Sequence, residues 1–541
     1  MDEHRSEAFR RISEFADLSM WARGSPGMVL GVTDREKTVF SSAKGSSEVS
    51  SERPMDIDAL FQIGSVSKSF TCIALLQLAE QGIIDLHRPV KEYLPWFSVK
   101  SKHRDIAVHH LMTHTAGIIL GSDATPTAWT EVWDLRDTEA TSEPGTFFHY
   151  SNSGYKALGL VLETVTGRPY GEILREGVFE SAGMRSSEPV ITNGIRKRLA
   201  VAHLPTDDDR PFRRGADLSE ATWFEGDTAD GSICAPVEDM LAYIRVLLNR
   251  GQGPWGQILS SDSFKRMTTP YIEPDDGVHR GGYGYGLNIE KVEGHTRVGH
   301  TGGMVGYQTA MLMDMDSGVG AMVMVNGPGS PDEVAKFAID TMRTPSGGSG
   351  LPRVPTREDV LKTPNPTDYV GAYAGPSGKL EVSDHEGVLH MTSEGRRTPI
   401  EHVAGDAFVS YAPGFELFLL EFERMGDRVV RAHHGERTYS RDGTPEGPAG
   451  PAIADGVRFD GHYRSHNPWL SNFRVVKRMG GLVLAPANDP SLPMVHLGGN
   501  LFRIGGDPRS PERIEFDCVI DGVATSARSP GGGRFGRTFT P

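Results

Sequence analysis

The feature that most constrains this chain is a Ser-x-x-Lys tetrapeptide, Ser65 to Lys68, inside a segment predicted to be helical. A short apolar stretch precedes the serine, and apolar residues then recur at helical spacing until Gly82, which suits a C-terminal stop. Ser65 and Lys68 are three residues apart, so they share one helix face. A lysine placed there can take the proton of the serine hydroxyl, which is a poor nucleophile until a base activates it.

Two further elements follow in the chain. Tyr150 and Asn152 are two residues apart after a turn, so both side chains can face one cavity. His300 lies in the glycine-rich stretch Gly299–Gly303 between two predicted strands, where glycines let a ligand approach the backbone closely. Each element alone is weak evidence for an active site. A helix cap with a surface lysine would explain Ser65 and Lys68, a buried core tyrosine would explain Tyr150, and a simple hairpin turn would explain the stretch around His300. Their fixed order carries more information.

Together, Ser65-x-x-Lys68, Tyr150-x-Asn152 and His300-Thr301-Gly302 resemble the three motifs of the penicillin-recognising serine hydrolases. The Tyr-x-Asn form resembles the second motif of one branch of this group, which contains class C β-lactamases, D-alanyl-D-alanine carboxypeptidases, D-aminopeptidases and related esterases. Histidine in place of lysine in the third motif resembles the D-aminopeptidase and esterase members more than a typical β-lactamase. The resemblance covers roughly residues 1 to 340.

The resemblance implies catalytic roles for four side chains. Ser65 is the nucleophile that forms an acyl-enzyme, and Lys68 and Tyr150 share the proton transfers, with the base for acylation left open between them. Tyr150 can act as that base only where nearby cations stabilise its phenolate. His300 replaces a permanent cation with a group that titrates near neutral pH, which weakens the case for binding a substrate carboxylate there.

The same resemblance implies three substrate-binding positions. Asn152 would bind the substrate amide or orient Lys68. Gly302 and Gly303 would line the substrate, and the backbone N–H groups of Ser65 and Gly303 would form the oxyanion hole, where donors aimed in advance lower the barrier. We expect no metal and no cofactor.

Composition narrows the function classes. A chain of 541 residues predicts two to four domains, and a net charge of -15 disfavours nucleic acid or an anionic membrane as partner. The N-terminal residues lack the pattern of a signal peptide, no run approaches the length of a membrane span, and three scattered cysteines predict no disulfide framework. We therefore expect a cytoplasmic protein that acts on a small molecule or short peptide, with a homodimer as an option.

The predicted fold class is α+β. Residues 1–342 are expected to form a β-lactamase-like serine hydrolase domain, an antiparallel sheet flanked by helices. An amphipathic helix at 7–21, a hairpin at 27–42 and strands within 296–326 are predicted there. A linker rich in Ser, Gly and Pro follows at 343–364.

The rest of the chain has the alternating, turn-rich pattern typical of all-β structure. The stretch at 369–373 is repeated at 459–463, which predicts two β-modules, 365–447 and 455–541, joined by a Gly/Pro-rich stretch. Each module is long enough for a small closed, lipocalin-like barrel. A catalytic domain followed by two barrels resembles the three-domain D-aminopeptidases. The modules either restrict access to the active site or serve stability or dimer formation.

Two clusters of polar residues offer weaker signals. His110 and His114 could share a helix face next to His109, but no glutamate completes a zinc-binding pattern, so we expect His114 to pack beneath the active site. Asp207–Asp209 predict a solvated loop, with binding of a substrate ammonium group as the alternative.

The sequence therefore predicts a serine hydrolase that acts on small amides or esters through a Ser65 acyl-enzyme, first of all on a D-amino-acid peptide or amide. The alternatives are a carboxylesterase or an acyl-transferring peptide cyclase on the same scaffold. A catalytically silent protein that binds peptides or β-lactams is a third alternative, and the intact Ser65, Lys68 and Tyr150 speak against it.

Overall fold

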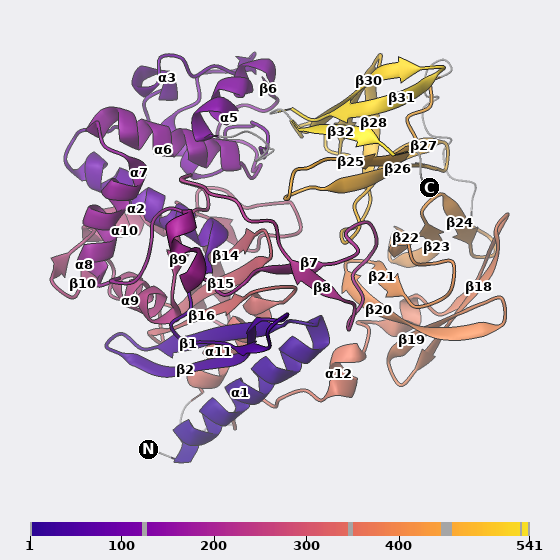
Figure 1. Ribbon diagram of the computed structural model, residues 1–541, viewed down its shortest axis with the longest axis horizontal. Coiled ribbons are helices and arrows are strands. Elements are labelled where there is room, and N and C mark those ends of the chain that lie inside the picture. Colours follow the sequence, from indigo (N-terminus) through magenta and orange to yellow (C-terminus); the bar gives the residue numbers. More distant parts are fainter. Residues whose placement is uncertain (1–2, 122–126, 345–349, 445–456, 531–532, 539–541) are drawn as a thin grey trace. The chain divides into compact units, whose positions relative to one another are not determined.

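The computed structural model divides into two compact units (Figure 1). Parts of the predicted linker and of the predicted joint between the β-modules, 345–349 and 445–456, lie outside the described residues. The structure describes residues 3–121, 127–344, 350–444, 457–530 and 533–538. Unit 1 contains Met1–Leu204 and Leu218–Val354, and unit 2 contains Pro205–Asp217 and Pro355–Pro541. Within these described ranges, no helix has the length and apolar character needed to span a bilayer.

Unit 1 is built on an eight-stranded antiparallel sheet with the order β12-β13-β14-β15-β16-β1-β2-β3. The predicted hairpin is β1 (Gly27–Thr33) with β2 (Thr38–Glu48), and β1 also pairs with β16 (Val319–Val325), so early and late strands meet in the middle of the sheet. Every residue of β1 is buried, because helices cover both faces there. The other strands are β3 (Arg53–Pro54), β12 (Gly282–Tyr283), β13 (Asn288–Val292), β14 (His295–Met304) and β15 (Tyr307–Asp314).

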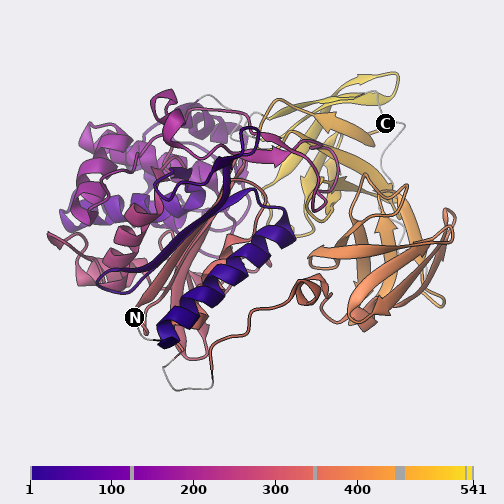
Figure 2. The same ribbon diagram turned by 60° about the horizontal axis from the view of Figure 1, so that its bottom comes forward.

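Two helices cover one face of this sheet. The predicted amphipathic helix is α1 (Glu3–Arg23), and it packs with α11 (Pro331–Met342) over β1, β15 and β16 through residues such as Ile12 and Ile339. Figure 2 shows α1 lying along this face. Helix α9 (Val237–Leu248) packs on β1 and β16 and belongs to the larger core cluster on the other face.

A mainly helical layer completes unit 1 on the side of α9. Its central helices are α2 (Ser67–Glu80), which carries ten consecutive buried positions, and α6 (Asn152–Thr166), which buries apolar residues such as Leu158 and Leu162. The shorter helices are α3 (Val90–Tyr93), α4 (Val108–Met112), α5 (Ala128–Asp134), α7 (Tyr170–Leu174), α8 (Glu180–Ala182) and α10 (Ser261–Met267). Short strand pairs are β4 (Phe61–Gln62) with β9 (Cys234–Ala235), β5 (Lys100–Ser101) with β6 (Glu139–Ala140), β7 (His203–Pro205) with β8 (Leu218–Glu220), and β10 (Gln252–Gly253) with β11 (Gly256–Gln257).

Unit 2 contains two closed barrels, β17–β24 and β25–β32, which confirms the predicted fold class of an α+β domain followed by two small β-barrels. A short helix, α12 (Arg357–Leu361), precedes them. The first barrel comprises β17 (Gly371–Gly375), β18 (Gly378–His385), β19 (Val388–Ser393), β20 (Arg396–Ala404), β21 (Ala407–Ser410), β22 (Leu420–Met425), β23 (Arg428–His434) and β24 (Arg437–Ser440). The second comprises β25 (Gly461–Arg464), β26 (Asn472–Arg478), β27 (Gly481–Ala485), β28 (Leu492–Gly498), β29 (Leu501–Ile504), β30 (Arg513–Ile520), β31 (Val523–Arg528) and β32 (Arg534–Arg537).

The sequence repeat corresponds to a repeated contact in the two barrels. The Tyr373 hydroxyl donates to the carbonyl of Tyr369 at 2.6 Å, and the Tyr463 hydroxyl donates to the carbonyl of Phe459 at 2.8 Å. Both tyrosines are fully buried, so each hydroxyl needs an acceptor inside its barrel. The matching positions of the repeat therefore perform the same structural task.

The segment Pro205–Asp217 leaves unit 1 and belongs to unit 2, which the sequence does not signal. Asp208 forms an ion pair with Arg464 at 2.7 Å, and Asp209 forms one with Arg474 at 3.1 Å. Asp208 and Asp209 are therefore compensated by arginines of the second barrel, which leaves these two carboxylates poorly suited to bind a substrate ammonium group.

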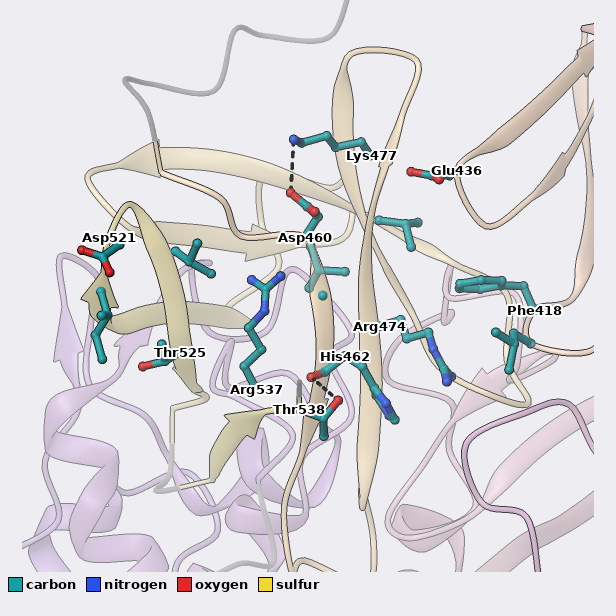
Figure 3. A pocket seen from close by; sticks show the side chains of 16 residues that line it. Phe418, Glu436, Asp460, His462, Arg474, Lys477, Asp521, Thr525, Arg537 and Thr538 are labelled. Atoms are coloured by element: carbon teal, nitrogen blue, oxygen red, sulfur yellow. Dashed lines mark hydrogen bonds and ion pairs between the residues drawn. The ribbon is translucent and has the colours of Figure 1, made fainter. Parts of the chain in front are cut away.

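Unit 2 also has a cavity of about 730 Å³ (Figure 3). Phe418 of the first barrel lines it together with Asp460, Lys477 and Arg537 of the second. Lys477 forms an ion pair with Asp460 at 3.1 Å, so charged groups of the lining compensate each other. Since all three sequence motifs lie in unit 1, we place the candidate active site there.

Candidate active site

Ser65 lies at the junction between the sheet and the helical layer. It sits in a 3₁₀ turn, η1 (Gly64–Val66), that runs directly into α2, and not in the first turn of the α-helix itself. The turn needs glycine at position 64, because φ is +55° there and a Cβ would come within 2.7 Å of the Gly303 carbonyl oxygen. This close approach places the partly exposed Ser65 beside β14.

Lys68 is fully buried and its amine makes three hydrogen bonds. Nζ lies 2.9 Å from Ser65 Oγ, 2.8 Å from Asn152 Oδ1 and 2.8 Å from the main-chain oxygen of Asp230. The last two atoms are carbonyl oxygens, which only accept hydrogen bonds. Two protons of the amine are therefore committed, and the third direction points at Ser65, where a neutral amine has its lone pair.

Tyr150 and Asn152 come from the segment that starts α6. The Ser151 hydroxyl accepts a hydrogen bond from the Gly154 N–H at 3.0 Å and caps the helix, so Asn152 is held at its first turn. The Tyr150 side chain lies within electrostatic range of Ser65, and Lys68 Nζ lies 4.9 Å from the centre of the tyrosine ring. Burial raises the pKa of Tyr150 above its ordinary value, so the resting phenol holds its proton.

His300 is a neutral imidazole in this environment. Its Nδ1 lies 2.5 Å from the Thr301 carbonyl oxygen, which can only accept, so Nδ1 carries the proton. Nε2 then accepts from the Tyr283 hydroxyl at 3.1 Å. Burial lowers the pKa of His300 to about 3. The expectation that His300 titrates near neutral pH is therefore wrong, because water cannot reach the ring to stabilise its charged form.

The two glycines of the third motif differ in the space around them. A Cβ on Gly302 would lie 1.9 Å from the Ile63 carbonyl oxygen, so no side chain fits there. A Cβ on Gly303 would meet no atom within 4 Å, so the strand faces open space at this position. The structure thus brings Gly303 and the Ser65 turn together next to room for a ligand.

His114 packs against Tyr150, and its backbone differs from the expectation. Helix α4 ends at Met112 and His114 has φ +55°, so it does not share a helix face with His110. Its Nδ1 accepts the Ser151 N–H at 3.0 Å, and its ring stacks on the Tyr150 ring with centroids 4.0 Å apart. Burial lowers the pKa of His114 well below its usual range, so a neutral ring supports the tyrosine.

A second imidazole beside Tyr150 escaped the sequence analysis. His279 Nδ1 lies 2.7 Å from Asp276 Oδ2, and the His279 ring stacks with the Tyr150 ring at 5.4 Å. The carboxylate fixes the proton on Nδ1 and orients the ring. A histidine three residues after an aspartate in an irregular loop matches no catalytic pattern, so the sequence carried no signal for it.

A buried ion pair supports the start of α6. Lys156 and Glu131 are 5% and 0% exposed, and their charged atoms are 2.8 Å apart. The Ser153 hydroxyl donates to the second Glu131 oxygen at 2.7 Å. Lys156 is one helical turn after Asn152, so this network fixes the helix end that presents Asn152 to Lys68.

One group of side chains has the spacing of metal ligands. Donor atoms of His295, Asp314 and Asp316 lie within 4.8 Å of one another near the β14–β15 hairpin. Asp314 Oδ1 accepts the N–H groups of Asp316 and Ser317, and Asp316 Oδ2 accepts that of Thr296. These carboxylates stabilise turns, and we assign no metal to them.

A helix-flanked antiparallel sheet that presents a serine bonded to a buried lysine, with a tyrosine beside them, defines a serine hydrolase. Residues 10–340 match the family model described as Beta-lactamase, and the chain belongs to this family. The resemblance drawn from the three motifs is thereby confirmed.

Named relatives narrow the comparison. The chain is 26% identical over 344 residues to a D-aminopeptidase of Brucella anthropi, covering 57% of this chain but only 58% of that protein. It is 26% identical to a D-aminopeptidase of Cereibacter sphaeroides over 434 residues, which are 75% of this chain and 76% of that one. Among solved structures, the octameric penicillin-binding protein homologue from Pyrococcus abyssi has a TM-score of 0.60 at 25% identity, covering 80% of this chain and 99% of that one.

Proposed function

We propose that this enzyme hydrolyses amides of D-amino acids, as a D-aminopeptidase or D-amino-acid amidase, through an acyl-enzyme on Ser65. The observation that carries the proposal is the contact between Lys68 Nζ and Ser65 Oγ at 2.9 Å, made by an amine that also bonds to the carbonyl oxygens of Asn152 and Asp230. The relatives named D-aminopeptidase support the choice of substrate class.

Acylation follows from these contacts. A neutral Lys68 amine accepts the proton of the Ser65 hydroxyl, and the serine oxygen bonds to the substrate carbonyl carbon. The main-chain N–H groups of Ser65 and Gly303 stabilise the negative charge that develops on the carbonyl oxygen. The C–N bond then breaks, and the leaving amine takes a proton from the Tyr150 phenol, which Lys68 replaces.

Deacylation uses the same groups in reverse. A water molecule loses its proton to the Lys68–Tyr150 pair and attacks the ester carbon, and Ser65 recovers its proton as the acid leaves. Asn152 bonds to Lys68 Nζ at 2.8 Å and keeps the amine aimed at Ser65 through both steps.

The neutral His300 favours this substrate class over penicillins. Its Nδ1 proton is held by a main-chain carbonyl and burial keeps the ring uncharged, so it provides no fixed cation for a penicillin carboxylate. We therefore propose that Gly302, Gly303 and His300 shape the site beside the acyl group without binding a carboxylate strongly.

The test is a substrate panel with matched stereochemistry. D-alanine p-nitroanilide, its L-enantiomer, p-nitrophenyl acetate and a cephalosporin are compared on the wild type and on Ser65→Ala. We expect the D-anilide to be preferred to the L-anilide, slow cephalosporin turnover, and a loss in kcat on the order of 10³ or more for Ser65→Ala. Efficient ester cleavage without amide cleavage would favour the carboxylesterase alternative instead.

A covalent probe separates an enzyme from a silent binding protein. Intact-mass spectrometry after treatment with a fluorophosphonate should show one adduct on the wild type and none on Ser65→Ala. Transfer to an added amine nucleophile in place of water would favour the acyl-transferring alternative. An unlabelled wild type would contradict the proposed nucleophile.

Assembly and location belong to the same proposal. The octameric state stated for the Pyrococcus abyssi homologue makes an oligomer reasonable here, and the sequence allowed a homodimer. Light scattering on the purified chain measures its mass in solution. The cytoplasmic location stays a prediction that cell fractionation would test.

A further inference from the structure

Asp230 is a buried residue whose main-chain oxygen bonds to Lys68 and whose side chain is a carboxylate. The residue is 7% exposed, and its Oδ1 has no hydrogen-bond partner among the residues that the structure describes. A buried polar atom left without a hydrogen bond costs stability, and a carboxylate costs more than a neutral group. Such an atom needs an explanation, and a ligand that supplies the missing donor is one.

Other carboxylates near the site have partners. Asp276 is bonded to His279 at 2.7 Å, and Glu131 forms its ion pair with Lys156 at 2.8 Å. Both are therefore compensated within the protein, whereas Asp230 presents an acceptor that the fold has not used.

Asp230 is held at the reaction centre by its own backbone. Its main-chain oxygen accepts from Lys68 Nζ at 2.8 Å, and the preceding Ala229 carbonyl accepts the Thr71 hydroxyl at 2.7 Å. On the other side, a Cβ on Gly231 would lie 3.8 Å from Gly64 Cα, next to the Ser65 turn. The loop is thus held against both the Ser65 turn and the first turns of α2.

The Asp230 charge also reaches the acid–base pair. It is one of the causes that raise the pKa of Tyr150, after burial, so carboxylate and phenol lie within electrostatic range. A positively charged group of the substrate at Asp230 would therefore sit near the groups that act on its scissile carbonyl.

We infer that the Asp230 carboxylate binds the α-ammonium group of an aminoacyl substrate. This inference rests on the proposed function and narrows it to substrates with a free amino group next to the scissile carbonyl. An ammonium group offers three donors and a full charge, which supplies the hydrogen bond that Oδ1 lacks and neutralises the buried carboxylate.

The experiment compares two substrates that differ by the amino group alone, D-alanine p-nitroanilide and propionyl p-nitroanilide. The wild type should prefer the amine-bearing substrate. In Asp230→Asn, which keeps the shape but removes the charge, the ratio of kcat/KM between the two substrates should fall by about 10- to 100-fold, mostly through KM, since hydrogen bonds to charged groups have about that strength.

The matched control is Asp227→Asn, which removes an exposed carboxylate from the same loop. Its substrate ratio should equal that of the wild type. An equal loss on both substrates in Asp230→Asn would overturn the inference, because it would show that Asp230 only adjusts Lys68 and Tyr150. A wild type without preference for the amine would also overturn it.

Failure of the proposed function has a different signature. If the wild type cleaves neither p-nitroanilide, amide hydrolysis is contradicted, and the pair D-alanine methyl ester and methyl propionate then decides the role of Asp230 by the same ratio. A ratio that falls in Asp230→Asn supports ammonium binding for esters, and an unchanged ratio overturns it.

Discussion

The candidate active site of unit 1 and the arginines of unit 2 treat poorly exposed charged groups differently. In unit 2, arginines meet carboxylates: Arg474 binds Asp209, and Arg478 binds Glu421 at 3.1 Å. In the candidate active site of unit 1, Lys68 bonds to the carbonyl oxygens of Asn152 and Asp230, and Asp230 Oδ1 has no hydrogen-bond partner among the described residues. Ion-paired charges hold a structure, whereas a buried acceptor without a hydrogen bond is available to a substrate.

The largest effect is expected from removing Lys68 and Tyr150, alone and together. Lys68→Ala and Tyr150→Phe should each lower kcat by roughly 10² to 10⁴, the range typical of a lost acid or base. Because both belong to one proton path through Ser65, the double variant should lose little more than either single variant.

The measurement is a double-mutant cycle on kcat with the preferred substrate. Losses that multiply would show that the two groups act independently and would contradict a shared path. Circular dichroism of each variant checks that the buried sites still fold.

Acid stability compares a buried histidine from each unit. Burial lowers the pKa of both His300 and His434 from 6.5 to about 3. Between pH 6.5 and 3, each of these histidines is therefore protonated in the unfolded chain but neutral in the folded one. The stability that each neutral ring contributes is present above pH 6.5 and is lost as the pH falls toward 3.

Replacing either ring by glutamine should flatten the fall of Tm between those pH values, His300→Gln for unit 1 and His434→Gln for unit 2. Thermal unfolding scanned from pH 7 to 3 is the measurement, with His4→Gln as a control, since the His4 ring is only partly buried. If Tm falls with pH in both variants as steeply as in the wild type, the lowered pKa of these two histidines does not cause the loss of stability in acid.

The ion pairs of unit 2 offer a smaller effect. Arg474 is 7% exposed, and Arg474→Met keeps much of its apolar volume while removing the partner of Asp209. We expect unit 2 to lose about 1.5 to 3 kcal/mol of stability, as for hydrogen bonds to charged groups. Chemical denaturation gives the loss, and fluorophosphonate labelling of Ser65 should persist, since unit 1 has its own core.

The matched control is Arg509→Met, because Arg509 pairs with Asp507 two residues away at an exposed position. Exposed pairs contribute little, so this change should cost well under about 1 kcal/mol. Equal losses of stability in the two variants would contradict the expectation that the buried ion pair stabilises unit 2 more than the exposed one.

The sequence predicted what local spacing encodes. The helix after Ser65 and the two barrels follow from periodicity and repeats, and the family follows from the three motifs. It missed His279 and Glu131, because their partners are defined by the fold and not by a motif. The charge state of His300 was also missed, since it depends on burial that no single residue type reveals.

Truncation gives the smallest expected effect and tests whether unit 2 influences substrate choice at all. A chain of residues 1–344 would leave the loop Pro205–Asp217 without its ion-pair partners, because Asp208 and Asp209 bind arginines of the removed barrel. The Thr206 nitrogen and the Asp217 carbonyl oxygen are 2.9 Å apart, so a short Gly-Ser turn can replace the residues between them.

If the β-modules restrict access, this shortened protein should cleave bulkier esters and longer peptides a few-fold faster than the full chain. Its kcat on the best small substrate should be lower, because a lid also positions the substrate. A ladder of substrates of increasing size, measured on the full chain and on the folded truncation, makes the comparison. Unchanged selectivity would assign unit 2 to stability or assembly, in keeping with its compensated charges.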